Sequence, residues 1–410
     1  MIRKLRNLVS YVLYVCSLNK GMVAVIVIDL VFLAFSIFNY KGMVQTSAGL
    51  AAFLIILANL LWQIYRFITN FSFLSNFDPR NKVSEDEDSA TTFANYRVKD
   101  LDNYQRNDDL GVLENEMVDR VLQDNHVRII PVDDSRRCTK RDRTKRYIQQ
   151  YKQILLIFLN HKWHELKDAG MFRNDSKICF CDEFDPGSNQ WYVCRASYYN
   201  GYLTNTIYSK RIDNSGFTLD APWNVRNKPI LPFQRSSFSD HIGVSTLVVT
   251  KDDYILVFQQ ASYAGQSAGK LCPSGSGSMD WADFKKTDQD FKETIIRGVE
   301  RELFEETKTK GKKRRAELKK ILDTKVLKYY RDMARGGKPE FCCITRIDKS
   351  RNEFERMISP DHSELNTQVC EFIKVNDQAK WNSIIGNRTK TSLPLIMNYK
   401  AVMEYLGNSE

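Results

Sequence analysis

Two apolar runs near the N-terminus restrict the fold of this chain more than any other feature. The first extends from Gly21 to Phe38 with one acidic residue, Asp29, and the second extends from about Ala48 to Ile64. Each is close to the roughly 17–25 residues that an α-helix needs to cross a bilayer. Because the bilayer core offers no water to the backbone, such segments must be helical. The sequence therefore predicts two transmembrane helices over residues 21–67, joined by a turn at Asn39–Gly42.

The flanking residues predict how this hairpin is oriented. Residues 1–20 are basic and amphipathic, as an interfacial helix would be. A cleaved signal peptide is the alternative for the first run, but the second run and the missing small-residue cleavage site argue against it. Basic residues precede the first run, whereas Lys41 alone lies in the turn, so both termini are expected in the cytoplasm. Asp29 indicates either a polar contact within an oligomeric bundle or part of a conduction path. The simpler alternative is a carboxylate that a partner helix satisfies.

Composition restricts the partners of the remaining chain. The 410 residues carry a net charge of +10, which favours anionic partners such as phospholipid headgroups or phosphorylated ligands. Nine cysteines are scattered without a C-x-x-C pair, so we expect reduced thiols rather than disulfides or a zinc site. A chain of this length can carry more than one domain.

Between the hairpin and residue 237 the sequence predicts a linker and then a mixed extension. Residues 68–110 are polar and charged and indicate the linker, and residues 111–236 form the helical and β extension. A basic run over residues 136–146 indicates a solvated face or a contact with anionic lipid or a phosphorylated ligand. Two histidines, His161 and His164, are interpreted as structural. The predicted elements are helices at about Leu113–Asp124 and Tyr147–Ala169 and strands at Lys177–Cys181, Trp191–Ser197 and Tyr202–Tyr208, followed by a loop-rich stretch, Asp213–Pro232.

Residues 237–410 alternate between strong strand and helix patterns. One hairpin is predicted where Lys251–Asp253 separates two apolar strands, and another where Arg335–Pro339 forms a turn. The predicted elements are strands at His241–Thr250, Tyr254–Gln260, Thr324–Arg331, Phe341–Ile347 and Glu371–Lys374 and a closing helix at Leu393–Leu406.

A glutamate-rich stretch, Glu293–Thr309, contains the strongest candidate site. Glu302, Glu305 and Glu306 would share one face of a helix, because they are spaced at i, i+3 and i+4. Like charges at this spacing destabilise a helix, and a bound Mg²⁺ or Mn²⁺ would offset that cost. Such a cation binds phosphate oxygens and activates water. The alternative is an exposed, amphipathic helix without a metal.

The pattern E-x7-R-E-U-x-E-E, with U a bulky apolar residue, resembles the Nudix box. Its matching positions here are Glu293, Arg301, Glu302, Leu303, Glu305 and Glu306. The resemblance implies that Glu302, Glu305 and Glu306 hold the metal, that Glu305 and Glu306 act in catalysis, and that Glu293 and Arg301 support them. Thr287 and Lys308 stand where the box has glycine. The nearest glycines, Gly275 and Gly277, precede an inserted segment, Met279–Gln289.

The complete layout resembles the two-transmembrane, SMODS-associated Nudix effectors of bacterial cyclic-oligonucleotide anti-phage systems (CBASS). It implies an α+β chain: an N-terminal transmembrane hairpin followed by a cytoplasmic Nudix-like α/β/α sandwich over residues 237–410, with an N-terminal extension. The implied location is the bacterial inner membrane, multi-pass, with both termini cytoplasmic. The implied partners are membrane lipid, a homo-oligomer and a cyclic dinucleotide or oligonucleotide made by a partner nucleotidyltransferase. Direct DNA binding is not expected.

Two functions of different classes follow. In the first, the Nudix-like domain senses a cyclic nucleotide and the hairpin disrupts the inner membrane, causing abortive infection. The ligand would lie between the glutamate helix and a loop at Gly275 and Gly277, whose backbone approaches phosphate closely, and Trp281 and Phe284 would stack on a base or pack on the domain surface. In the second, the chain is a membrane-anchored, Mg²⁺-dependent Nudix hydrolase of a nucleoside diphosphate derivative.

Overall fold

The computed structural model divides the chain into two compact units. Unit 1 consists of residues 1–82 and 152–174, and unit 2 consists of residues 83–151 and 175–410. The chain therefore passes between the units after residues 82, 151 and 174. The structure describes residues 2–38, 47–75, 82–85, 93, 96–124, 126–132, 139–166, 173–214, 217–220, 229–260, 267, 269–285, 287, 289–307, 312–358 and 365–407.

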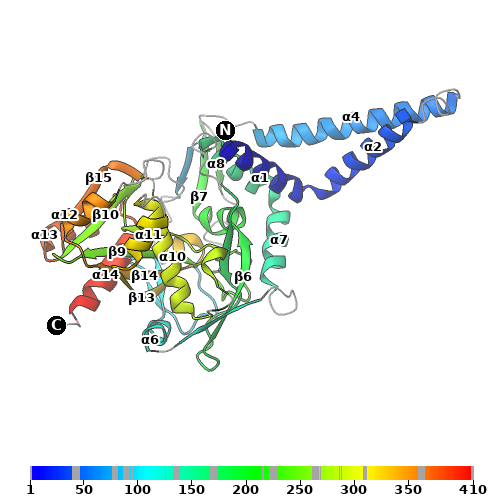
Figure 1. The fold of residues 1–410 in the computed structure, drawn as a ribbon. Helices are drawn as coiled ribbons and strands as arrows, with labels where there is room; N and C mark the ends of the chain where they lie inside the picture. Colours follow the sequence, from blue (N-terminus) through cyan, green and yellow to red (C-terminus); the bar gives the residue numbers. More distant parts are fainter. Residues whose placement is uncertain are drawn as a thin grey trace. The chain divides into compact units, whose positions relative to one another are not determined.

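Two helices of unit 1 coincide in sequence with the two predicted spans. α2 (Lys20–Phe38) and α4 (Ser47–Ser75) lie side by side as a hairpin (Figure 1). Asp29 of α2 is 9% exposed, and its carboxylate accepts a 2.7 Å hydrogen bond from the side-chain amide of Asn59 on α4. A helix of the same chain therefore satisfies this carboxylate, whereas the oligomeric bundle and the conduction path stay predictions. The predicted turn at Asn39–Gly42 lies outside the described residues.

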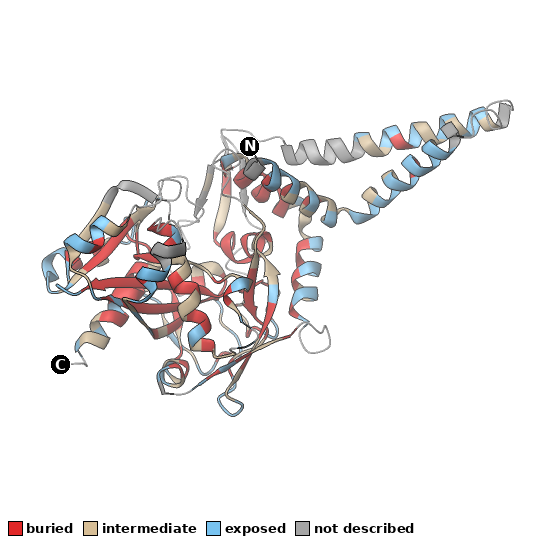
Figure 2. Ribbon diagram, in the orientation of Figure 1, coloured by how far each residue is buried: buried red, intermediate tan, exposed pale blue. Residues whose placement is uncertain are grey.

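The outer surface of this hairpin is apolar. Figure 2 shows α2 and α4 as largely exposed along their described lengths. Among the residues described, no single helix is both long and apolar enough to cross a bilayer. The segments Leu5–Leu18 and Lys20–Phe35 reach that length and composition only together, and they meet at a bend of 99°. The more than half-exposed large apolar side chains of the hairpin are Val27, Ile28, Val31, Phe32, Phe35, Leu54, Ile55, Leu61, Trp62 and Tyr65.

Unit 1 is completed by a helix from the middle of the chain. α8 (Lys152–Leu166) contacts α4 and packs against α1 (Ile2–Leu18), where Trp163 stacks on Tyr11 with ring centroids 4.6 Å apart. The predicted helix at Tyr147–Ala169 is instead two helices. α7 (Lys140–Gln150) ends at Tyr151 and belongs to unit 2. The extension predicted over residues 111–236 is thus divided between the units, because the apolar surface of α8 is buried in unit 1.

Unit 2 is built on a nine-stranded sheet. Its order is β11-β10-β9-β14-β13-β3-β2, with β12 paired to β9 and β15 paired to β10. β9 (Gly243–Thr250) and β14 (Lys338–Ile347) are parallel, whereas β13 (Leu322–Asp332) pairs antiparallel with β14. Both predicted hairpins, β9 with β10 (Tyr254–Gln260) and β13 with β14, are confirmed.

Helices cover both faces of this sheet. Phe341 and Cys343 of β14 share a core with α10 (Phe291–Glu306), and Cys342 and Ile344 share another core with α14 (Leu393–Gly407). Because successive side chains of a strand point to opposite faces, α10 and α14 lie on opposite sides. The predicted closing helix is confirmed as α14. The sheet-containing domain is therefore a mixed α and β structure with the glutamate helix on one face.

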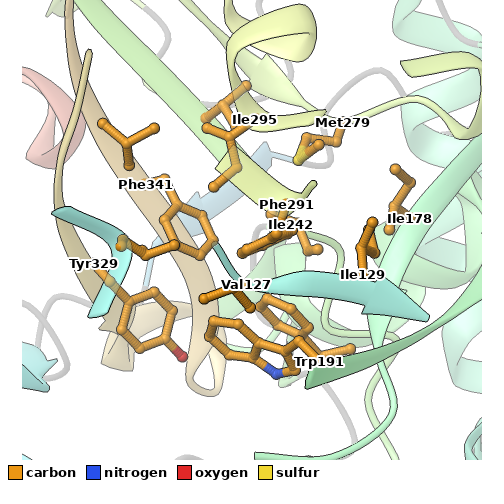
Figure 3. Close-up of a cluster of buried hydrophobic side chains, with 14 of the residues drawn as sticks. Val127, Ile129, Ile178, Trp191, Ile242, Met279, Phe291, Ile295, Tyr329 and Phe341 are labelled. Atoms are coloured by element: carbon orange, nitrogen blue, oxygen red, sulfur yellow. The ribbon is translucent and has the colours of Figure 1, made fainter. Parts of the chain in front are cut away.

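The extension shares a core with the glutamate helix (Figure 3). A second sheet has the order β4-β6-β5 and is formed by β4 (Arg128–Pro131), β5 (Ser176–Phe180) and β6 (Gln190–Ser197). Trp191 of β6 stacks on Phe180 at 3.9 Å and contacts Phe291 of α10 at 5.3 Å between ring centroids. Residues on both sides of the predicted boundary at 237 thus fold as one unit.

Two other predictions are wrong in their element type. Tyr202–Tyr208 is not a strand, because Tyr202–Thr206 forms a buried π-helix after α9 (Tyr198–Gly201). Strands also occur in the predicted loop-rich stretch. The helix predicted at about Leu113–Asp124 is confirmed as α6, but it begins at Glu116 and Leu113 lies in a strand. The remaining elements are β1 (Lys82–Glu85), β2 (Gln105–Asn107), β3 (Val112–Glu114), α6 (Glu116–Asp124), β7 (Lys210–Asn214), β8 (Phe217–Asp220), β11 (Leu271–Cys272), β12 (Gly275–Ser278), a 3₁₀ turn at Trp281–Asp283, α11 (Lys312–Lys319), a 3₁₀ turn at Met333–Arg335, α12 (Arg351–Met357), β15 (Leu365–Lys374) and α13 (Gln378–Ile385).

The cysteines follow the sequence prediction in part. Seven described cysteines are free thiols. Cys181 is disulfide-bonded, so the expectation of reduced thiols fails at that position. Cys179 and Cys194 lie opposite each other on β5 and β6, and their sulfur atoms are 3.1 Å apart.

Candidate functional site

The glutamate helix, α10, is fixed at its start by a side-chain cap. Asp290 accepts a 3.0 Å hydrogen bond from the backbone N–H of Glu293, as Asp commonly does at an N-cap. Ile295, Val299 and Leu303 are each at most 1% exposed and hold one face of the helix in the core. Burial of that stripe fixes the rotation of α10 and hence the direction of the remaining side chains.

The two glycines upstream of α10 lie in a strand and not in the predicted loop. Gly275 and Gly277 belong to β12, which pairs antiparallel with β9. A Cβ atom on Gly275 would lie 3.0 Å from the backbone of Leu303, and one on Gly277 would lie 2.3 Å from the Glu302 carboxylate. Glycine therefore lets α10 pack directly on β12. That close packing leaves no room for the nucleotide predicted between the helix and these glycines.

Arg301 is the centre of the polar contacts on α10. Its guanidinium donates to both carboxylate oxygens of Asp283, with Nε–Oδ1 and Nη2–Oδ2 distances of 3.0 Å, and to the Ser278 carbonyl at 3.1 Å. Its Nη1 donates to Glu302 Oε1 at 2.9 Å and lies 3.6 Å from Glu305 Oε2. Burial lowers the pKa of Arg301, but Glu302 and Asp283 outweigh this effect and raise it overall. Arg301 thus stays charged and holds two of the three predicted metal ligands.

The three predicted metal ligands differ in exposure. The side chain of Glu302 is 12% exposed, and that of Glu305 is 51% exposed. Glu306 is 4% exposed, and its Oε1 accepts a hydrogen bond from the Ser276 hydroxyl of β12 at 3.5 Å. The carboxylates therefore share the predicted side of α10, but only Glu305 is open to solvent.

Electrostatics at this end of α10 disfavour three ionised carboxylates. Burial raises the pKa of Glu302 to about 7, against the opposing effect of Arg301 and Lys177. The C-terminal end of a helix also carries a partial negative charge, which repels anions in the last turn. The last turn of α10 holds Glu305 and Glu306. A cation beside these side chains would stabilise their charged forms.

The three carboxylates are chemically suitable ligands for a hard divalent cation, although their oxygen atoms do not converge on one point. No group of three or more His, Cys, Asp or Glu side chains with metal-binding geometry occurs in the described part of the chain. Carboxylate oxygens are nevertheless the protein ligands that Mg²⁺ prefers. The residues that would hold such an ion are Glu302, Glu305 and Glu306. Lys308, at a glycine position of the box, lies outside the described residues.

Other residues predicted for the site lie apart from these carboxylates or are partly buried. Glu293 is exposed in the first turn of α10. Since it lies nine residues before Glu302, about 13 Å along the axis, it does not support these carboxylates directly. Trp281 and Phe284 pack against the core with ring centroids 5.7 Å apart. This arrangement matches the predicted alternative in which both pack on the domain's own surface.

A shallow pocket lies at the other end of α10. It has a volume of about 500 Å³ and includes Thr287, which stands at a glycine position of the box. The residues that line it are His126, Val127, Arg128, Thr287, Gln289 and Asp290. This pocket is therefore near the start of the helix and not beside Glu305.

Sequence reasoning missed three polar residues of the site. Lys177 of β5 donates to Asp280 at 2.5 Å and to the Ser278 carbonyl at 3.1 Å, the carbonyl that Arg301 also contacts. Asp283 caps the 3₁₀ turn as well as binding Arg301. The D-x-x-D spacing of Asp280 and Asp283 is a capping pattern that could have identified this turn. Lys177 carries no comparable signal, because only the tertiary fold brings β5 beside Asp280.

Comparison with known proteins adds little. No protein-family model and no curated protein matches this chain. The crystal structure of DR0079 from Deinococcus radiodurans matches with a TM-score of 0.27 and 12% identity, over 39% of this chain and 82% of that chain. A likeness at this level carries no argument about fold or function.

Proposed function

We propose that the chain is a membrane effector of a bacterial cyclic-oligonucleotide anti-phage system. Its sheet-containing, Nudix-like domain senses a cyclic nucleotide, and its helical hairpin disrupts the inner membrane, causing abortive infection. The observation that carries this proposal is the apolar outer surface of α2 and α4, in the same chain as a domain with a carboxylate helix. Soluble monomers rarely expose a continuous apolar surface of this kind, whereas lipid-facing helices do.

The length of α2 comes close to the thickness of a bilayer, although no described helix alone combines the length and apolar composition of a span. α2 has 19 residues, which extend about 28 Å at ~1.5 Å per residue. The hydrocarbon core of a bilayer is about 30 Å thick. The hydrogen bond between Asp29 and Asn59 satisfies the buried carboxylate inside the hairpin. Disruption would then require these helices to rearrange or to associate with further copies of the chain.

The polar contacts of α10 favour ligand binding over hydrolysis. Arg301 bonds to Asp283 and to Glu302, so the Glu302 carboxylate already has a cationic partner. We place the ligand phosphates beside the exposed side chain of Glu305, since α10 is closed against β12 on its inner side. A divalent cation held by the three glutamates would attract a phosphodiester there. The domain then needs only a difference in ligand affinity between two states of the chain to act as a sensor.

A membrane-anchored Nudix hydrolase is the second candidate. The observation in its favour is that Glu302, Glu305 and Glu306 occupy one side of α10, as the box requires. In this function the bound Mg²⁺ supplies Lewis acidity and an activated water. Arg301 orients Glu302, and the buried Glu306 excludes bulk water from the inner edge of the site.

The deciding experiment measures three outputs on one preparation of full-length protein in liposomes. Cyclic di- and trinucleotides, ADP-ribose and dinucleoside polyphosphates are each added with Mg²⁺, and binding, turnover and release of an entrapped dye are recorded. The double variant Glu305→Gln, Glu306→Gln tests the carboxylates. Glu317→Gln, which changes an exposed carboxylate on α11, is the matched control.

Each outcome separates the candidates. The effector function predicts that one cyclic nucleotide binds and releases dye from liposomes with wild-type and control protein, but at least tenfold less with the double variant. Rapid turnover of a nucleoside diphosphate derivative without dye release would support the hydrolase. A cyclic nucleotide that binds without ever releasing dye would contradict the coupling of the domain to the hairpin.

A further inference from the structure

α1 has two opposite apolar faces, and unit 1 covers only one of them. Tyr11 and Val15 are at most 4% exposed and lie on the covered face. Val9 and Leu13 are 47% and 63% exposed. Since each is two residues from Tyr11, their side chains point about 200° away around the helix. A helix that packs on protein through one face and exposes a second apolar face needs a second partner.

The covered face is held firmly by α8. The Tyr11 ring is nearly parallel to that of Trp163, at an interplanar angle of 9°, and its hydroxyl donates to Asn160 Oδ1 at 3.2 Å. These contacts fix the rotation of α1. The opposite face is therefore presented to the outside by the packing of unit 1 itself, and its exposed residues are Leu5, Val9 and Leu13.

The angle between α1 and α2 identifies what covers the exposed face. The two helices meet at 99°, with only Asn19 between them. Asn19 Oδ1 accepts a 3.3 Å hydrogen bond from Lys152 of α8, and Asn19 Nδ2 donates to the Val15 carbonyl at 3.0 Å. The corner is therefore braced by side chains. A helix at nearly a right angle to a membrane-spanning α2 lies parallel to the bilayer plane.

We propose that α1 is an in-plane membrane helix, with Leu5, Val9 and Leu13 inserted into the lipid surface and Tyr11 and Val15 facing α8. The exposed, basic side chains of Arg6 and Lys20 fit the anionic headgroups at that level. The lipid face of α1 continues into the apolar surface of α2. This inference rests on the proposed membrane location of the hairpin, and it adds the role of α1 and α8 as a platform at the membrane surface.

Site-directed spin labelling of the full chain in phosphatidylethanolamine and phosphatidylglycerol liposomes tests the proposal. Single cysteines replace Leu5 and Leu13 on α1, in a background where the partly exposed thiols Cys16 and Cys370 are serine. Label depth is measured from collisions with oxygen and with a water-soluble nickel chelate. Val31→Cys on α2 is the membrane control, and Lys251→Cys, at an exposed lysine of unit 2, is the aqueous control.

An in-plane helix predicts equal depths for the two α1 labels, within about 3 Å, at the ~5–10 Å depth of interfacial helices. If α1 continues across the bilayer, the eight residues between Leu5 and Leu13 give a depth difference of about 12 Å, which overturns the proposal. It is also overturned if both α1 labels lack contact with lipid while the Val31 label has it. If the Val31 label lacks lipid contact too, the membrane location in the proposed function fails with it.

Discussion

Replacing Lys140 with methionine removes the positive partner of a carboxylate that has no contact with solvent. The Lys140 ammonium bonds to the carboxylate of Asp240 and donates to the Phe233 carbonyl at 3.2 Å. The Lys140 and Asp240 side chains are 1% and 0% exposed. Lys140 is the first residue of α7, the last helix of unit 2 before the chain enters unit 1, so this ion pair attaches the start of that helix to Asp240.

The cost follows from what remains around Asp240. Removing one partner of a buried ion pair costs about 3–5 kcal/mol. Asn205 still donates to Asp240 at 2.9 Å, which places the expected loss near the lower value, about 3 kcal/mol. At roughly 2–4 °C per kcal/mol for a unit of this size, the melting temperature falls by about 6–12 °C.

The loss should depend on pH with a defined sign. Burial raises the pKa of Asp240, but Lys140 and Arg331 outweigh this effect and hold it below its ordinary value. The wild-type ion pair is thus lost only at pH values below about 4. Without Lys140, burial prevails and Asp240 takes up a proton more readily. The variant is therefore closest to the wild type in acid and falls behind it as pH rises.

Thermal unfolding of full-length protein in detergent, followed by tryptophan fluorescence at pH 7.5 and pH 4.5, measures both effects. Lys145→Met is the control, because Lys145 is exposed on the same helix. The double variant Lys140→Met, Asp240→Asn should recover part of the stability. A melting temperature for Lys140→Met within about 1 °C of the control at pH 7.5 would refute the reasoning.

Three further predictions concern other parts of the chain. Glu305→Gln with Glu306→Gln should weaken Mg²⁺ binding at least tenfold by isothermal calorimetry, and unchanged affinity would remove the proposed cation site. Burial raises the pKa of Asp119 to about 7, so the wild type loses stability as pH rises from about 4 to 7. Over that range Asp119→Asn should gain about 2 kcal/mol in free energy of unfolding relative to the wild type, measured with urea. If the two proteins show parallel pH profiles, the reasoning is contradicted. Trp163→Ala removes the ring stacked on Tyr11 and should lower the stability of unit 1 by about 3 kcal/mol. Faster proteolysis of α1 would detect this loss, whereas unchanged cleavage would show that the stack does not hold α1.

The elements with strong local patterns could be predicted from the sequence. The β13–β14 hairpin has long strands around Gly336 and Gly337, whose φ angles of 63° and 82° favour glycine. α10 could be placed because its apolar stripe and its glutamates repeat with the helical period. Arg301 could be assigned a supporting role from the box, whereas its contact with Asp283 could not, since only the tertiary fold brings the 3₁₀ turn beside α10.

Failures occurred where tertiary packing overrides local pattern. Gly275 and Gly277 resemble a loop in sequence, yet they form a strand because α10 approaches too closely for any side chain. Tyr202–Thr206 has aromatic and β-branched residues that favour a strand, but buried packing makes it a π-helix. Periodicity predicts α8 as a helix, whereas its membership of unit 1 depends on contacts with Tyr11, which periodicity does not encode.

The chain crosses between the two units three times, and this sets the order in which unit 1 is completed during translation. The ribosome completes α1, α2 and α4 by residue 75, but unit 1 lacks α8 until residue 166 has emerged. At roughly 5–20 residues per second, translation of those 91 residues takes about 5–18 s. During this interval Tyr11 has no Trp163 to stack on. The hairpin must therefore wait, with its α8-binding surface open, while much of unit 2 is still unmade.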